Sequence, residues 1–289
     1  MISKDSTCFS CLPLPKAINL AEIERFINDN ATKRIHFTTQ HSAAIHKGND
    51  GTTWLNLPFQ EPFESIAKSK LNLNRVLSIN KNNKLCRRLN DDEEERFKEL
   101  IDELGELVLL RDCLDLSIAL CMHEYVSDDR KTQRSVLGEH EYQLKYNSDK
   151  YDTSGDLKAL TEELQKRLDN MPFFKHADYI MAVPSSKSFM VEIIEGLEGF
   201  NFINISDRAS WIDKKDSLKY LEDPKEKLER IESWGFSFDK DTDIKDKTIL
   251  LVDDMYKSGV TMQYVAMKLK EAGAKRVFGI CLCKALGNK

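Results

Sequence analysis

Residues 248–261 read TILLVDDMYKSGVT, and this stretch decides the fold. Its first five residues are apolar or β-branched, which is typical of a buried strand. Two adjacent carboxylates, Asp253 and Asp254, follow at the expected end of that strand. A short loop with one glycine, Gly259, then leads into a helix that we expect over residues 262–272. Ligands of open α/β sheets bind at the carboxyl ends of strands, so this order of features predicts a binding site.

The loop carries groups that can surround a phosphate. The backbone N–H groups of residues 257–261 and the hydroxyls of Ser258 and Thr261 can donate to phosphate oxygens. The start of the following helix adds the positive end of its dipole, and Gly259 lets the backbone approach a ligand closely. The two carboxylates suit a different task, which is to hold ribose hydroxyls directly or through Mg²⁺. A carboxylate pair beside a phosphate loop predicts a sugar phosphate as the ligand.

The segments around this stretch alternate between strand and helix patterns. We expect strands over residues 179–183, 202–205, 248–252 and 276–283, and helices over residues 157–168, 191–197, 223–231 and 262–272. Such alternation predicts a parallel sheet flanked by helices. Residues 206–247 are mostly polar, which is typical either of a solvated charge run or of a functional lid.

With these elements in place, the sequence resembles the type I phosphoribosyltransferases. The family motif is an apolar strand, two acidic residues, two apolar residues and a Ser/Thr-rich turn with a central glycine, which residues 252–255 and 258–261 match. Two positions depart from it, because Tyr256 replaces a usual aliphatic residue and Lys257 replaces a usual small hydroxyl residue. Within the family, the chain is similar to the competence protein ComF group over about residues 140–289, in the segments Leu144-Lys145-Tyr146, Val183-Pro184, Glu229-Arg230 and Gly235-Phe236.

The resemblance implies a type I phosphoribosyltransferase-like α/β domain that binds 5-phosphoribosyl 1-diphosphate (PRPP). It implies a pentosyltransferase with Mg²⁺ as cofactor, which transfers the 5-phosphoribosyl group to or from a base or nucleotide. Matched positions assign the ribose and indirect Mg²⁺ contacts to Asp253 and Asp254. The resemblance assigns the 5-phosphate to Lys257, Ser258, Gly259, Val260 and Thr261, the diphosphate to Ser185, Ser186 and Lys187, and mobile-loop contacts to Arg208, Lys214 and Lys215.

Two other functions stay open at this point. Some proteins with this fold sense PRPP or nucleotides without catalysis, and the residues Tyr256 and Lys257 leave room for such a sensor. An accessory role in a DNA-uptake or bacterial defence system is the third reading. A homodimer and a protein or nucleic-acid partner for the N-terminal domain also stay open, as does the acceptor.

The N-terminal part is expected to be a separate, mainly helical domain over residues 1–135, with the phosphoribosyltransferase-like domain over residues 140–289. Asn90 and the acidic residues after it predict a helix start, and apolar residues follow at helical spacing. Residues 107–121 are very apolar and are expected to form a buried helix. Residues 34–39 alternate like a short strand, residues 49–51 form a turn signal, and residues 126–138 mark the expected boundary.

Composition restricts the remaining readings. The net charge of −5 lacks the basic footprint of non-specific nucleic-acid binding. No apolar run approaches the roughly 20 residues of a membrane span, and the N-terminus lacks a secretory pattern. Seven scattered cysteines favour a reduced, cytoplasmic protein. Cys8 and Cys11 form half of a zinc pattern without a second pair, so free thiols are the preferred interpretation.

Overall fold

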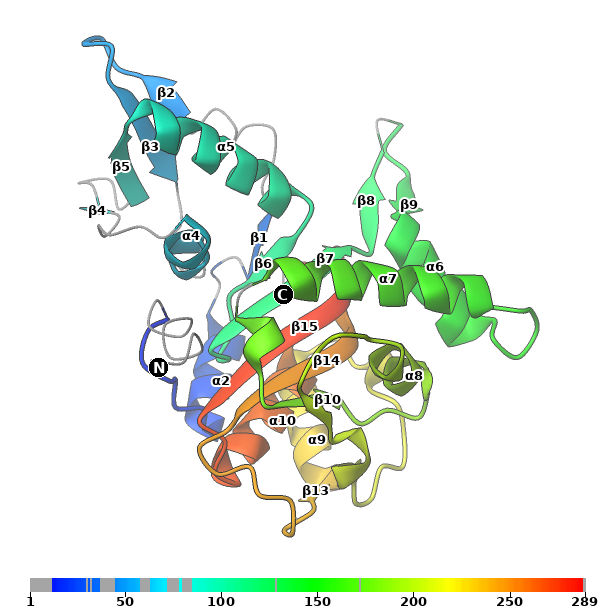
Figure 1. Cartoon of the computed structure of the whole chain (residues 1–289). Coiled ribbons are helices and arrows are strands. Elements are labelled where there is room, and N and C mark those ends of the chain that lie inside the picture. The colour runs from blue at the N-terminus through cyan, green and yellow to red at the C-terminus, as the bar shows by residue number, and fades with distance from the viewer. Residues whose placement is uncertain are drawn as a thin grey trace. The chain divides into compact units, whose positions relative to one another are not determined.

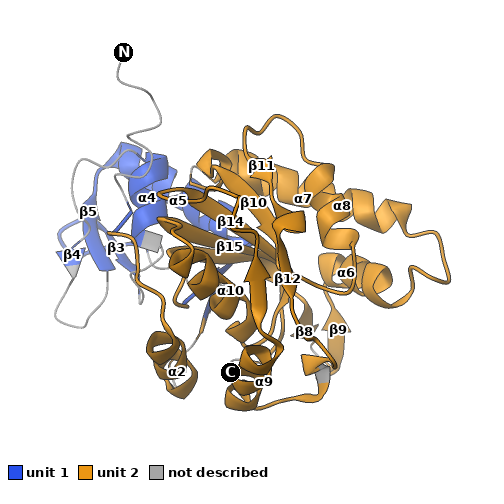
Figure 2. Ribbon diagram, turned by 90° about the horizontal axis from the view of Figure 1, so that it is seen from below, with its two compact units in different colours: residues 1–13, 34–111 blue, residues 14–33, 112–289 orange. Residues whose placement is uncertain are grey.

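The computed structural model describes residues 12–29, 31, 33–36, 45–57, 63–71, 78–79, 85–127, 129–171 and 173–287. The chain divides into two compact units (Figure 2). Unit 1 comprises residues 1–13 and 34–111, and unit 2 comprises residues 14–33 and 112–289. The division in sequence thus falls after Arg111, and unit 2 continues through the stretch 126–138 where we expected a boundary. None of the described helices combines the length and apolar composition that a bilayer crossing requires.

Unit 1 contains helices together with an antiparallel sheet. The helices are α4 (Phe63–Leu71) and α5 (Asp91–Gly105), and the strands are β1 (Arg34–His36), β2 (Ile45–Lys47), β3 (Thr53–Leu57), β4 (Ser78–Ile79), β5 (Leu85–Leu89) and β6 (Val108–Leu110). Strands β2, β3, β5 and β4 pair in that order, and β1 pairs with β6. The expected start of α5 is confirmed, because the Asn90 side chain accepts a hydrogen bond from Glu93 N at 2.8 Å. The turn at residues 49–51 joins β2 to β3, with Gly51 at φ +78°.

Unit 2 is built on a parallel sheet (Figure 1). Its strands pair in the order β7 (Leu116–Met122), β15 (Arg276–Lys284), β14 (Thr248–Tyr256), β10 (Tyr179–Ala182) and β11 (Ile203–Asn204). All nine residues of β15 are buried, as expected for a central strand with both faces covered. This arrangement confirms the parallel α/β sheet that the alternating pattern predicts.

Two groups of helices cover this sheet. The first group is α6 (Val136–Tyr146), α7 (Ser154–Asn170) and α8 (Phe189–Glu195), and the second is α2 (Leu20–Asn28), α9 (Pro224–Trp234) and α10 (Val260–Glu271). Short antiparallel pairs complete the unit, namely β8 (Glu124–Val126) with β9 (Thr132–Arg134) and β12 (Ala209–Trp211) with β13 (Phe236–Phe238). The polar stretch 206–247 therefore holds β12, α9 and β13, and it also contains the 3₁₀ turns η3 (Ser206–Arg208) and η4 (Leu218–Tyr220).

The expected buried helix over residues 107–121 is wrong. This stretch forms β6 and β7, with a bend between them. A continuous apolar run fits either a buried helix or a strand with both faces covered, and periodicity cannot separate the two. β7 pairs in parallel with β15 along most of its length, and its first five residues are buried. The burial of a strand inside the sheet, rather than a helical core face, explains the apolar composition.

Asp115 joins several segments of unit 2 just before β7. Its side chain is 1% exposed and accepts hydrogen bonds from the backbone N–H of Lys16 and of Val277, both at 2.8 Å. The Lys270 ammonium donates to the same carboxylate at 2.9 Å. Burial lowers the pKa of Lys270, which the charge of Asp115 opposes. The start of β15, the end of α10 and the segment before α2 therefore depend on one buried carboxylate.

Replacing this carboxylate should be costly. Asp115→Ala should lower the free energy of unfolding by about 3–5 kcal/mol, because it leaves the Lys270 ammonium without its counter-charge and two backbone N–H groups without this acceptor. Urea denaturation followed by circular dichroism measures the loss. Asp149→Ala serves as the control, because that side chain is 88% exposed and its removal should change stability by less than about 0.5 kcal/mol. Equal stability of the two variants would contradict this role for Asp115.

Candidate functional site

A cavity of about 1080 Å³ opens at the carboxyl ends of β10 and β14 in unit 2. Its walls come from the end of β14 with the following loop, from the segment after β10, from α6, and from the region between β11 and β14. This is the place where ligands of open α/β sheets bind. The cavity therefore lies where the sequence pattern predicts a site.

Most of the predicted site residues line this cavity. They are Asp253, Asp254, all five residues of the loop 257–261, Ser185, Ser186, Lys187 and Lys214. Two of the mobile-loop candidates, Arg208 and Lys215, do not line the cavity. Arg208 pairs with Asp239 at 3.2 Å, and Lys215 pairs with Asp213 at 2.8 Å on a side chain that is 77% exposed. Of the three mobile-loop cations, only Lys214 is placed to meet a ligand in the cavity.

The acidic pair lies inside β14 and not beyond its end. The strand continues to Tyr256, because residues 253, 255 and 256 keep their register with β15. Asp253 Oδ1 accepts a hydrogen bond from the backbone N–H of Asp254 at 3.0 Å. Burial, followed by the charge of Asp254, raises the pKa of Asp253 well above its usual range. The strand therefore holds two adjacent carboxylates, and the charge of Asp254 makes ionisation of Asp253 less favourable.

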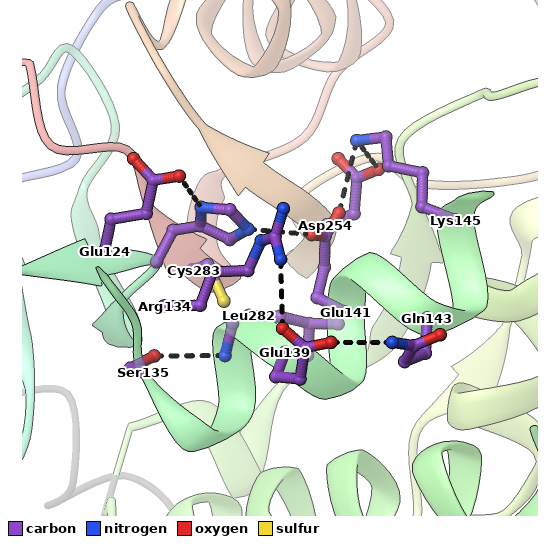
Figure 3. A network of polar contacts seen from close by, with 12 residues as sticks. Glu124, Arg134, Ser135, Glu139, Glu141, Gln143, Lys145, Asp254, Leu282 and Cys283 are labelled. Atoms are coloured by element: carbon purple, nitrogen blue, oxygen red, sulfur yellow. Dashed lines mark hydrogen bonds and ion pairs between the residues drawn. The ribbon is translucent and has the colours of Figure 1, made fainter. Parts of the chain in front are cut away.

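Lys145 neutralises this pair from α6. Its Nζ lies 2.5 Å from Asp254 Oδ2 and 3.3 Å from Glu141 Oε1, as Figure 3 shows for these three side chains. Burial alone would lower the pKa of Lys145, but the charges of Asp254 and Glu141 outweigh it and raise the pKa overall. Glu141 is completely buried, and its other oxygen lies 3.3 Å from His123 Nε2. Lys145 thus links the buried Glu141 to Asp254 through two ion pairs.

The surroundings of Asp254 bear on whether it could bind a metal ion directly. Among the described residues, no group of three or more His, Cys, Asp or Glu side chains could hold a metal ion. The Oδ2 atom of Asp254 already carries the ammonium of Lys145. Mg²⁺ requires near-octahedral oxygen coordination, and it would have to displace this cation to bind Asp254 directly. The residues present therefore do not fit a resident magnesium ion on Asp254.

The predicted phosphate loop, residues 257–261, is shaped by the ring of Tyr256. Gly259 precedes the first residue of α10 and has φ +75°, a left-handed conformation that favours glycine. A Cβ atom at Gly259 would lie 2.1 Å from Oη of Tyr256. That hydroxyl is buried and donates to Asp112 Oδ2 at 3.3 Å. The unusual Tyr256 of the motif therefore packs directly against Gly259. Glycine is needed at position 259 to avoid a clash with this ring as well as for its backbone conformation.

The segment that contains the predicted diphosphate loop is hydrogen-bonded to the polar stretch 206–247. Ser185, Ser186 and Lys187 follow β10, and Lys187 is the most loosely held, with its Nζ 3.8 Å from Asp149. The indole N–H of Trp211 in β12 donates to the carbonyl of Pro184 at 2.8 Å. The antiparallel pair β12–β13 is thereby anchored beside the loop.

Sequence reasoning did not find Glu141, Lys145 or Lys227 as parts of the site. Lys145 entered only through a short family segment, and the other two carried no motif. The spacing of Glu141 and Lys145, four residues apart, is the one local signal that could have indicated an ion pair on a helix. The contact of Lys145 with Asp254 requires the tertiary structure, because more than a hundred residues separate α6 from β14.

The Gly259–Tyr256 contact yields a double-mutant test. Gly259→Ala should destabilise the protein and abolish binding of ribose 5-phosphate, because the new methyl group meets the buried ring. Adding Tyr256→Leu should restore part of both losses, leaving a backbone cost of about 1–2 kcal/mol for a non-glycine residue in the left-handed region. Denaturation and calorimetry of the four proteins check this. Losses that simply add would show that the ring does not limit the loop.

The Lys145–Glu141 pair yields a second test. Lys145→Met should lower the free energy of unfolding by about 3–5 kcal/mol, because the buried carboxylate of Glu141 loses its cation. Combining it with Glu141→Gln should recover at least about 1 kcal/mol relative to the sum of the single changes. Additive effects in this cycle would mean that the two side chains are not coupled in solution.

Comparisons with known proteins found a family model that matches the second half of the chain. Residues 159–288 match the family model described as phosphoribosyl transferase domain. Two solved structures are similar to the chain. One, titled hypoxanthine-guanine-xanthine phosphoribosyltransferase, has 16% identity and a TM-score of 0.29, over 47% of this chain and 66% of that one. The other, titled structure of the allosteric regulatory enzyme of purine biosynthesis, has 17% identity and a TM-score of 0.35, over 61% of this chain and 35% of that one.

The chain therefore spans less than two thirds of either structure's own length. A search of curated proteins found no match. The likeness to this family rests on the match of the family model over residues 159–288, and the parallel sheet that carries the cavity lies largely within those residues.

Proposed function

We propose that the cavity binds PRPP and that the protein transfers its 5-phosphoribosyl group to or from a base or nucleotide. One observation carries this proposal. The acidic pair of β14, the phosphate loop and the predicted diphosphate loop all line a single cavity. A sugar that bears a phosphate at one end and a diphosphate at the other requires these three groups together.

The charge of the cavity supports a polyanionic ligand. Seven Lys or Arg side chains line it against three Asp or Glu side chains; the cations are Arg134, Lys145, Lys150, Lys187, Lys214, Lys227 and Lys257. Cationic side chains that cluster with few acidic neighbours raise the local concentration of anions and accelerate their binding. PRPP, with its phosphate and diphosphate groups, fits such a wall better than a neutral nucleoside does.

Each part of the ligand has a proposed place. The 5-phosphate binds the N–H groups of residues 257–261 at the start of α10, where the helix dipole favours an anion. The ribose hydroxyls donate to Asp253 or Asp254, and the residues 185–187 hold the diphosphate. The magnesium expected from the resemblance is proposed only as an ion that the diphosphate brings, since Lys145 already occupies Asp254.

The chain's contribution to transfer is positioning and charge stabilisation. Loss of the diphosphate leaves positive charge at C1 of the ribose, and the fixed carboxylates of β14 lie in the same cavity as the sugar. Fixed charges of this kind lower the barrier because they need no reorganisation during the reaction. Lys214 is the proposed lid cation, and burial lowers its pKa although Asp253 and Asp254 oppose that shift.

A PRPP or nucleotide sensor is the second candidate. The pairing of Lys145 with Asp254 favours it, because a carboxylate committed to an internal cation is less available to the reacting sugar. The similarity to the ComF group, a cytoplasmic location, a homodimer and an accessory role in DNA uptake or defence stay predictions. The acceptor also stays open, because no described feature of the cavity identifies a base.

The acidic pair separates these functions experimentally. Asp253→Asn with Asp254→Asn should weaken PRPP binding by about 2–4 kcal/mol, because hydrogen-bonded charged groups are removed. The same variant should keep the affinity of the wild type for inorganic phosphate. Isothermal calorimetry with PRPP and Mg²⁺, and separately with phosphate, measures both. Unchanged PRPP affinity would show that the carboxylates face elsewhere.

Diphosphate release distinguishes the enzyme from the sensor. In an enzyme, release from PRPP should fall in the double variant at least as much as binding does. Binding by the wild type without release under any acceptor tried would favour the sensor. Cys8→Ser with Cys11→Ser serves as a control, because these residues lie outside the described part of the chain and the proposal gives them no role.

A further inference from the structure

Lys227 is a buried lysine in the wall of the cavity. It lies in the second turn of α9 and is 5% exposed. Among the described residues, none forms a hydrogen bond or an ion pair with its ammonium group. Glu222 and Asp223 influence it only through longer-range attraction. The side chain nevertheless lines the cavity and meets open space there.

The first turns of α9 lie close to the phosphate loop. Helices α9 and α10 pack against each other. A second cavity of about 470 Å³ is lined both by the first residues of α9 and by Ser258 of the phosphate loop. Lys257 also repels Lys227 electrostatically, and this repulsion adds to burial in lowering the pKa of Lys227. Lys227 and the loop 257–261, which is proposed to hold the 5-phosphate, also line the same larger cavity.

Most of the Lys227 side chain is covered, while the residue lines the cavity. Partial removal of an ammonium group from water is unfavourable unless an anion or hydrogen bonds compensate it. An apolar side chain, like that of the neighbouring buried Leu228, would cover the same surface without this cost. The helix does not need the charge either, because Asp223 already caps its start by accepting from Lys225 N at 2.8 Å. A ligand anion is the compensation that the free protein lacks.

We propose that Lys227 binds the phosphomonoester of the ligand, so that α9 and the first turn of α10 hold one phosphate between them. This inference rests on the proposed function, because it deepens the same phosphate site. It makes Lys227 a binding residue outside the 248–261 stretch, contributed by a helix of the lid region. Binding of the phosphate would then also hold α9, which lies within the region 206–247 that contributes to the cavity wall.

The experiment compares Lys227→Met with the wild type in the full-length chain. Calorimetry uses ribose 5-phosphate, which carries only the phosphomonoester, and inorganic diphosphate, which stands for the other end of PRPP. We expect the variant to bind ribose 5-phosphate about 10- to 100-fold more weakly, the range for losing a charged hydrogen bond. Diphosphate affinity should stay within about threefold, because Lys187 and the residues before it are unchanged. Lys158→Met is the charge-matched control, with a helical lysine that is 75% exposed.

Thermal unfolding without ligand supplies an independent readout. Lys227→Met should unfold at the same or a higher temperature than the wild type, because a buried charge is removed. A lower unfolding temperature, with Lys158→Met unaffected, would overturn the inference and make Lys227 a structural residue. Equal affinity of wild type and variant for ribose 5-phosphate, or a loss confined to diphosphate, would overturn it while leaving the proposed function intact. A wild type that binds neither ligand would overturn the proposed function and this inference together.

Discussion

The position of β14 between two parallel neighbours is the constraint on which the site depends. Residues 249–252 pair with both β10 and β15, so the strand cannot shift without breaking two ladders. Its last residues therefore present the acidic pair at a fixed height, and Tyr256 ends the strand beneath Gly259. The start of α10 is set by that contact. One strand thus fixes both the carboxylates and the phosphate loop.

Charge balance is the second organising feature of the site. The free protein satisfies the negative charge of Asp254 internally, through Lys145 and the buried Glu141. It leaves the opposite charge of Lys227 uncompensated. An anionic ligand would therefore balance the positive charge of Lys227 near α9 and α10. Near α6, the charge of Lys145 is already balanced by Asp254 and Glu141. The cavity lining is basic, with seven Lys or Arg side chains against three Asp or Glu side chains, although the chain as a whole carries −5.

The sequence predicts the second half of the fold well, because each element there has a local signal. The strand at 248–252 is a short apolar run beside a glycine turn, and Asp223-Pro224 starts α9 as expected. The helix expected over residues 107–121 was wrong, because a strand covered on both faces shows no alternation of apolar and polar residues that would separate it from a buried helix. The sheet of unit 1 was missed because charged residues interrupt its strands, as in Leu85-Cys-Arg-Arg-Leu89.

Prediction of the site residues had the same limit: local signals were readable, and tertiary contacts were not. The residues predicted from one contiguous motif and the predicted residues 185–187 line the cavity, and their role in binding stays a prediction. Glu141, Lys145 and Lys227 were not, since α6 and α9 reach the cavity only through tertiary packing. Gly259 was found for a backbone reason, whereas the ring beneath it could not be foreseen from an unusual Tyr256.

A crystal structure of the protein with ribose 5-phosphate tests the central claim most directly. The account predicts the phosphate on the N–H groups of residues 257–261, within hydrogen-bonding distance of Lys227, and the ribose hydroxyls against Asp253 or Asp254. A phosphate bound at another place, or a sugar turned away from the carboxylates of β14, would contradict it.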